Sequence, residues 1–143
     1  MKMLDRLTRH RRGASRKVMR TVMSGRRPRV ILHGINYSPE LIGVGRYSGE
    51  LAEYLAATGC DVEVVTAVPH YPGWRAQPPY SAYRYVCEVL NGVRIIRCPL
   101  LLRENAPGIW RMLAPLSFAG AAAPVIFWRI LRSRPDTLFC VEP

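Results

Sequence analysis

No two cysteines in this sequence lie close enough to form a CxxC site. The four cysteines are Cys60, Cys87, Cys98 and Cys140, and none is within three residues of another. This spacing excludes the redox and zinc sites that need paired cysteines. Each cysteine has apolar neighbours in the sequence, so we expect four reduced, buried thiols of a cytoplasmic protein.

Acidic residues are scarce, and their distribution divides the chain into two parts. The 143 residues include 21 Lys or Arg but only 10 Asp or Glu, which gives a net charge of +11. Residues 1–29 hold eleven of the basic residues and one acid, whereas residues 30–143 hold ten basic residues and nine acids. A basic leader, residues 1–28, therefore precedes a nearly neutral body. This pattern disfavours a nucleic-acid-binding fold and predicts peripheral attraction to an anionic membrane.

Long hydrophobic runs are also missing. The leader has no apolar core segment, so it is not a secretory signal. It is either a basic amphipathic helix on a membrane surface, or a disordered tail or upstream extension. Residues 112–128 carry no charge, but Pro115 and Pro124 interrupt a stretch that would need about twenty apolar residues to span a bilayer. We expect residues 109–132 to form a helix that packs on a sheet or lies on the bilayer.

Strand and helix patterns alternate in the body. "RVILH", residues 29–33, predicts a buried parallel strand, and residues 45–59 predict a helix that ends at Gly59. Its apolar positions at helical spacing are Tyr47, Leu51, Tyr54 and Leu55. "CDVEVVTAV", residues 60–68, predicts a second strand, which completes a right-handed βαβ unit.

The later segments extend this unit into a larger sheet. Residues 69–85, rich in Pro and aromatic residues, predict a long functional loop. Two β-type runs flank Asn91-Gly92, a favoured hairpin turn, and "DTLFCVEP" predicts a last strand. The fold class is therefore α/β, with a Rossmann-like parallel sheet and flanking helices. Because no helix follows that last strand, we expect residues 29–143 to be an incomplete domain.

The segment "GINYSPELIGVGRYSGELAEYL", residues 34–55, predicts a glycine loop that opens into a helix. Glycines let backbone N–H groups approach an anion, and the helix N-terminus attracts it. Arg46 either adds donors there or is simply solvated. A dinucleotide fingerprint would need glycine at Ser48 and an acid where the second strand ends, at residues 66–69. Both are missing, which disfavours a nicotinamide cofactor.

Order and spacing along the body resemble a known family. "INYSPELIGVGRYSGELAEYLAATGCDVEVVTAVPHYPGW", "GVRIIRCPL" and "PDTLFCVEP" are similar to family-4-type glycosyltransferases of GT-B fold, in the branch that builds exopolysaccharides of the colanic-acid kind. The resemblance covers Arg29 to Pro143. It implies two Rossmann-like domains that face each other across a cleft, an N-terminal one for the acceptor and a C-terminal one for a nucleotide-sugar. This chain matches the first part of the N-terminal domain, so the resemblance places the donor-binding domain and the expected catalytic base beyond the chain end.

The resemblance also implies a set of site residues. The glycine loop would lie near the donor phosphates and the acceptor, a role that carries onto Gly43, Val44, Gly45 and Arg46. Weaker candidates are Asn36, Tyr37, Glu40, His70, Tyr71 and Glu142. His70 is alternatively an ordinary loop histidine, and the aromatic residues Trp74, Tyr80, Tyr83 and Tyr85 form either a sugar platform or packing for their loop. No metal and no cofactor are expected, because the nucleotide-sugar is a co-substrate.

These inferences predict the acceptor-side portion of a glycosyltransferase that acts on a glycan or polyprenyl-linked acceptor. We expect it at the cytoplasmic face of the plasma membrane and inactive as this chain alone. The rival hypothesis is a non-catalytic, membrane-associated scaffold or one subunit of a split glycosyltransferase.

Overall fold

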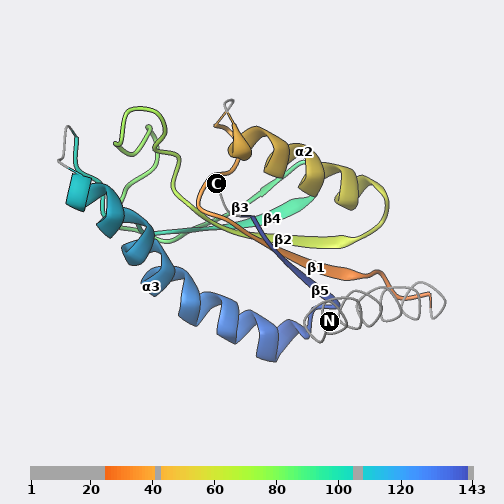
Figure 1. Cartoon of the computed structure of the whole chain (residues 1–143). Helices are drawn as coiled ribbons and strands as arrows, with labels where there is room; N and C mark the ends of the chain where they lie inside the picture. Colours follow the sequence, from red (N-terminus) through yellow and green to blue (C-terminus); the bar gives the residue numbers. More distant parts are fainter. Residues whose placement is uncertain (1–24, 41–42, 105–107, 142–143) are drawn as a thin grey trace, which may run out of the picture.

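Five strands form one sheet in the computed structural model, which describes residues 25–40, 43–104 and 108–141. Almost all of the basic leader, and the candidate Glu142, lie outside these residues. The strand order is β3-β4-β2-β1-β5 (Figure 1). The bounds are β1 Arg29–His33, β2 Asp61–Ala67, β3 Val86–Leu90, β4 Val93–Cys98 and β5 Thr137–Cys140.

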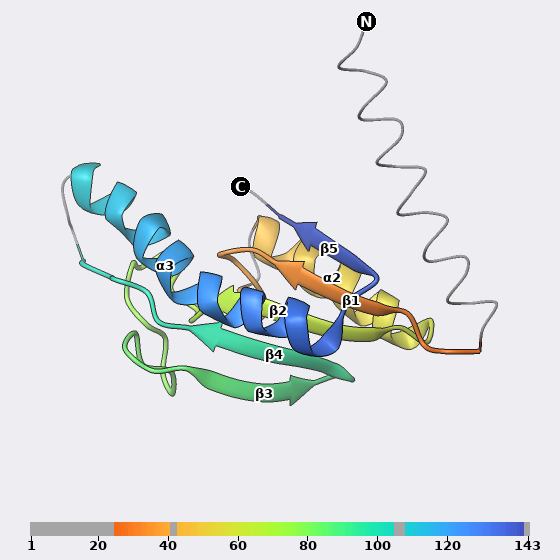
Figure 2. The same ribbon diagram turned by 90° about the horizontal axis from the view of Figure 1, so that it is seen from below.

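All neighbouring strands are parallel except the β3/β4 pair. Helix α2 (Val44–Ala57) covers one face of the sheet and helix α3 (Gly108–Ser133) crosses the other, as Figures 1 and 2 show. The chain runs from β1 to β2 and β4 on one side of β1, and then returns through α3 to β5 on the other side, so the topological switch point lies between β1 and β5. The predicted α/β class with a mostly parallel, Rossmann-like sheet is confirmed. We call the edge where the parallel strands start the amino edge, and the edge where they end the carboxyl edge.

Local sequence signals place the β3/β4 hairpin as predicted. Asn91 and Gly92 both have positive φ angles, 50° and 80°, which a two-residue turn of this kind requires. The hairpin lies at the amino edge, because β4 runs parallel to β2 and β3 runs back along it.

The apolar core has two halves, one on each face of the sheet. Ile31, Val65 and Ile96 pack with Phe118 on the α3 side. On the other side Ala52 of α2 packs with a second set of strand residues, which includes Leu32, Val64 and Ile95. Strands buried on both faces explain the continuous apolar runs seen in the sequence.

Helix α2 packs through small residues and not through its large apolar ones. Its buried residues are Gly45, Ser48, Gly49 and Ala52. Tyr47 and Tyr54 remain 71% and 67% exposed, and only Leu55 of the predicted apolar series joins the core. The backbone lies so close that a Cβ on Gly49 would come within 3.2 Å of the Ser38 Cβ. Close approach therefore selects small residues on this face.

The helix expected over residues 109–132 is confirmed as α3, and it continues through Pro115 and Pro124, which were expected to interrupt the apolar stretch. Both prolines are exposed, so the carbonyl groups that lose an N–H partner lie on the side that faces water. A narrow stripe of Ala114, Phe118 and Ala122 is buried against the sheet. Of the two arrangements predicted for this helix, this is the one in which it packs on a sheet. By length and composition α3 is also apolar enough to cross a membrane, a test that core helices pass as well.

The prediction of four buried thiols is wrong for three of the cysteines. All four are free, but only Cys98 is buried; Cys60 is half-buried, and Cys87 and Cys140 are exposed. Cys87 and Cys140 belong to β3 and β5, the two outermost strands, whose residues are mostly exposed. Apolar neighbours in the sequence do not reveal that a strand lies at the end of a sheet.

Candidate functional site

The predicted ligand loops lie together at the carboxyl edge. The glycine loop follows β1, and the aromatic loop, residues 69–85, follows β2, its neighbour in the sheet. Gly43 precedes α2 with φ +65°, a conformation that favours glycine. A Cβ on Gly45 would come within 3.1 Å of the Glu40 Cβ. Glycine at both positions therefore lets the loop turn tightly into the helix.

A buried carboxylate joins the two loops. Glu40 is 5% exposed, and its Oε1 accepts hydrogen bonds from the backbone N–H groups of His70 at 2.8 Å and Tyr71 at 2.9 Å. Its Oε2 accepts a hydrogen bond from the Asn36 amide at 2.8 Å. Four residues that were singled out separately, Asn36, Glu40, His70 and Tyr71, thus form one cluster. Because donors of the chain occupy both oxygens of Glu40, its geometry is that of a positioning residue.

The four leading phosphate-site candidates have different surroundings. The N-terminus of α2 has no side-chain cap and no acid in its first turn, so its N–H groups remain suited to an anion. Val44 is half-buried and Gly45 is buried. The Arg46 guanidinium instead lies 2.8 Å from Glu50 one turn along the helix, and both side chains are well exposed. Of the two alternatives given for Arg46, donor to an anion or solvated side chain, the structure has the solvated one.

A buried arginine that was not singled out from the sequence supports the same loops. The Arg97 side chain is 1% exposed, pairs with Glu88 and donates to the backbone oxygen of Ser38 at 2.7 Å. Its guanidinium also lies 4.7 Å from the centre of the Tyr80 ring. Nearby, burial, reinforced by the charge of Glu53, raises the pKa of Tyr37 to about 12, so its hydroxyl stays protonated at neutral pH.

Most of the aromatic loop packs on the protein. Trp74 meets the buried His70 ring edge-on at 5.8 Å, and the His70 Nδ1 lies 2.9 Å from the Val68 carbonyl oxygen. The Tyr85 hydroxyl donates to the Ala121 carbonyl of α3 at 3.0 Å. Tyr83 is 78% exposed. Three of the four aromatic residues, Trp74, Tyr80 and Tyr85, thus contact the rest of the protein, and Tyr83 is the most exposed of the four, with Tyr85 at 51%.

A cavity of about 310 Å³ lies where β1 and β5 end, at the topological switch point. Open α/β sheets bind ligands at this position. Its lining is mostly apolar: His33, Gly34, Ile35, Pro115, Leu116, Phe118, Ala119 and Val141. The His33 ring stacks on Phe118 at 5.2 Å, and its Nδ1 lies 3.2 Å from the Val65 carbonyl oxygen. A carbonyl can only accept, so Nδ1 is the donor in this contact, and the tautomer that protonates Nδ1 presents Nε2 as an acceptor.

Sequence reasoning missed His33 and Phe118 for different reasons. His33 is the last residue of the first strand, and that position faces the ligand edge in such folds, so a signal was present. Phe118 comes from a helix 85 residues later, and nothing local predicts its contact with His33. Among the residues that the structure describes, no group of three or more potential ligands is placed to hold a metal ion.

Comparisons with known proteins agree with this geometry. Residues 42–143 match the family model described as a glycosyl transferase 4-like domain. The chain is also 41% identical over 116 residues to WcaI of Escherichia coli (strain K12), whose name assigns it to colanic acid biosynthesis as a glycosyl transferase. That match covers 80% of this chain and 28% of the relative. With its sheet order, its glycine loop and its switch-point cavity, the chain belongs to the glycosyl transferase 4-like domain family.

Proposed function

We propose that this chain is the acceptor-side portion of a glycosyltransferase in cell-surface polysaccharide biosynthesis. It would contribute to transfer of a sugar from a nucleotide-sugar to a glycan or polyprenyl-linked acceptor. The observation that carries the proposal is the cavity at the switch point. In this chain of the glycosyl transferase 4-like family, the cavity lies at the same edge of the sheet as the glycine loop. An apolar wall suits an isoprenoid chain or a sugar face, and His33 Nε2 suits an acceptor hydroxyl.

Binding of an acceptor analogue tests this proposal directly. We expect a farnesyl-diphosphate-linked hexose to bind the 143-residue chain in calorimetry. Ala119→Phe should abolish binding, because Ala119 is exposed on α3 and lines the cavity. Ala123→Phe is the matched control, since Ala123 is exposed on the same helix and is not among the lining residues. Equal binding by wild type and both variants would contradict the cavity as acceptor site.

We further propose that the chain alone does not turn over nucleotide-sugars. The resemblance assigns donor binding to a domain that is not among these 143 residues, and the chain spans 28% of the relative it matches. Incubation of the purified chain with labelled nucleotide-sugars and the same acceptor analogue should yield no product. Any glycosylated product that disappears with Gly45→Leu would overturn this part of the proposal.

Peripheral membrane contact is part of the same proposal. Large apolar side chains of α3 remain exposed, among them Met112 at 69%, Leu116 at 65%, Phe127 at 66% and Trp128 at 62%. We expect the chain to float with anionic vesicles at low salt, and Phe127→Ser to weaken this more than Leu51→Ser on α2. Absence of flotation at low salt would remove the membrane from the proposal.

The rival hypothesis is a non-catalytic scaffold or a subunit of a split enzyme. The exposed apolar face of α3 suits a protein partner as well as a bilayer. Co-purification of a separate chain that binds nucleotide-sugars would favour the rival, particularly if Phe127→Ser disrupts the pair.

A further inference from the structure

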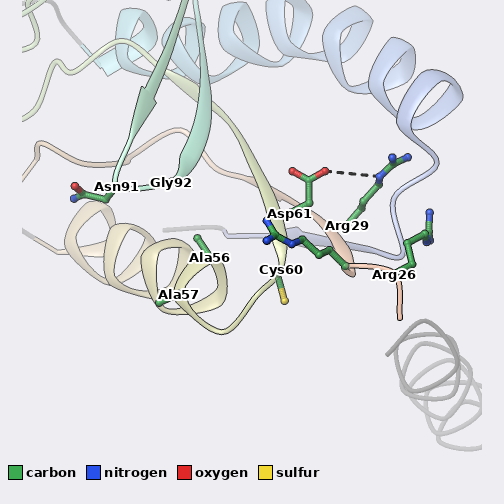
Figure 3. Close-up of a pocket in the computed structure, with 9 residues that line it drawn as sticks. Arg26, Arg29, Ala56, Ala57, Cys60, Asp61, Asn91 and Gly92 are labelled. Carbon is green, nitrogen blue, oxygen red and sulfur yellow. Dashed lines mark ion pairs between the residues drawn. The ribbon is translucent and has the colours of Figure 1, made fainter. Parts of the chain in front are cut away.

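A second pocket lies at the amino edge, opposite the proposed acceptor site. Its volume is about 600 Å³, and it is lined by Arg26, Arg27, Arg29, Ala56, Ala57, Cys60, Asp61, Asn91 and Gly92. Figure 3 shows that these residues come from the start of β1, the end of α2, the start of β2 and the hairpin turn. The pocket exists because two strand starts, the end of α2 and the hairpin turn meet at this edge.

Arginine supplies most of the polar groups of this pocket, and two of the three arginines are held by the fold. Arg26 donates from Nη2 to both carboxylate oxygens of the buried Asp136, at 3.0 and 2.9 Å. Arg29 donates from Nη1 to the Ser133 carbonyl at 2.8 Å. Fixed guanidinium groups lose little conformational freedom when they bind an anion.

The third arginine keeps its donors for a ligand. No hydrogen bond or ion pair involves Arg27 among the residues that the structure describes, and its side chain is exposed. The one acid in the lining, Asp61, is already shared by Arg94 at 2.8 Å and Arg29 at 3.7 Å. Positive charge therefore exceeds negative charge in the pocket.

The surroundings strengthen this excess. Arg132 lies in the last turn of α3, and Arg134 precedes β5 at the same edge, since β5 runs parallel to β1. Arg26 and Arg27 of the basic leader thus lie beside arginines of the nearly neutral body, so the amino edge is strongly basic.

We propose that this amino-edge pocket binds a phosphate group, as a site separate from donor and acceptor. Guanidinium forks match phosphate oxygens in bidentate pairs, and Arg27 has such a fork without a partner among the described residues, while Arg26 and Arg29 add positive charge beside it. The phosphate comes either from a phospholipid headgroup or from a free phosphate compound. The proposal does not depend on the glycosyltransferase activity, because the pocket lies at the edge opposite the glycine loop.

Cys60 provides an internal reporter for this site. It is half-buried and lines the pocket, whereas Cys87 and Cys140 are exposed elsewhere. We would compare alkylation by anionic iodoacetate and neutral iodoacetamide, site by site, by mass spectrometry. A basic pocket should favour iodoacetate at Cys60, relative to Cys87, by about threefold or more. Arg27→Gln should remove much of this preference, and Arg84→Gln, an exposed arginine of the aromatic loop, should leave it unchanged.

Competition distinguishes the two sources of phosphate. If inorganic phosphate slows Cys60 alkylation saturably and chloride at equal ionic strength does not, the pocket takes a free phosphate. If only phosphatidylglycerol vesicles protect Cys60, and phosphatidylcholine vesicles do not, it takes a lipid headgroup. The proposal is overturned if chloride protects as well as phosphate, if neither probe protects Cys60, or if Arg27→Gln is protected as strongly as wild type.

Discussion

Glu40 and His70 are 30 residues apart in sequence and are joined at 2.8 Å by a hydrogen bond from the His70 backbone N–H to the Glu40 Oε1. The Tyr71 N–H shares that oxygen, and Asn36 occupies the other. One buried carboxylate therefore fixes the glycine loop to the aromatic loop. The positions of both loops at the carboxyl edge therefore depend on this one side chain.

Replacing Glu40 should destabilise the fold in proportion to the donors left unsatisfied. We expect Glu40→Ala to lower the free energy of unfolding by about 3 kcal/mol, because three donors lose their acceptor. Glu40→Gln retains one amide oxygen and should cost about half as much. Urea denaturation measures both, with the exposed Glu104→Gln as the control. Equal losses for Ala and Gln would contradict this account of Glu40.

Gly34→Ala should loosen the contact between β1 and β5. A Cβ at Gly34 would lie 2.9 Å from the Val141 backbone oxygen, and backbone cannot yield as a flexible side chain can. We expect a loss of about 1–3 kcal/mol in the free energy of unfolding. Gly120→Ala is the matched control in α3, where nothing lies within 4 Å, and it should stabilise by about 1 kcal/mol. An unchanged free energy of unfolding for Gly34→Ala would show that β5 shifts easily to make room for the added Cβ.

The cysteines should differ sharply in reactivity. Burial raises the pKa of the Cys98 thiol to about 12, so it remains an uncharged thiol at neutral pH, whereas Cys87 and Cys140 are exposed. Iodoacetamide at pH 7.5 should modify Cys87 and Cys140 in the folded chain and leave Cys98 unmodified until urea is added. Rapid native labelling of Cys98 would mean that the β4 region opens readily.

Glu63 should make stability depend on pH. Burial of its carboxylate raises its pKa, although Arg129 and Arg94 act in the opposite direction. The folded state therefore holds the proton more tightly than the unfolded state, and this contribution is lost as pH rises from the ordinary carboxyl pKa through the raised one. Wild type should lose stability relative to Glu63→Gln over that range.

The difference in urea midpoint between wild type and Glu63→Gln, followed from about pH 4 to pH 8, measures this effect. Glu104→Gln, an exposed carboxylate, gives the reference curve. A difference that grows in favour of wild type with rising pH would mean that the ion pairs to Arg129 and Arg94 outweigh burial.

Local signals in the sequence were sufficient for most of the fold. The apolar run at residues 29–33 and the Asn91-Gly92 turn each determine their own conformation, so β1 and the hairpin were predicted correctly. Contacts between distant segments could not be read in this way. The buried face of α2 depends on how near the Ser38 side chain comes, and Arg97 is buried because loops far away in sequence fold over it.

The candidate site shows the same division. Glycines before a helix predict where an anion can approach, yet only the structure pairs Arg46 with Glu50 and unites Asn36 and Glu40 with His70. The amino-edge pocket was not predicted, although Arg26, Arg27 and Arg29 are close in sequence, because its other lining residues come from α2, β2 and the hairpin turn. Counting charges by segment found the basic stretch but not the distant segments that fold beside it.

The basic amino edge also makes the charge distribution of the molecule asymmetric along the strands. With Arg26, Arg27 and Arg29 at one end of the strands and the switch-point cavity at the other, the protein behaves as an electric dipole near any negatively charged body. Before contact, such a field turns the molecule so that the arginines lead.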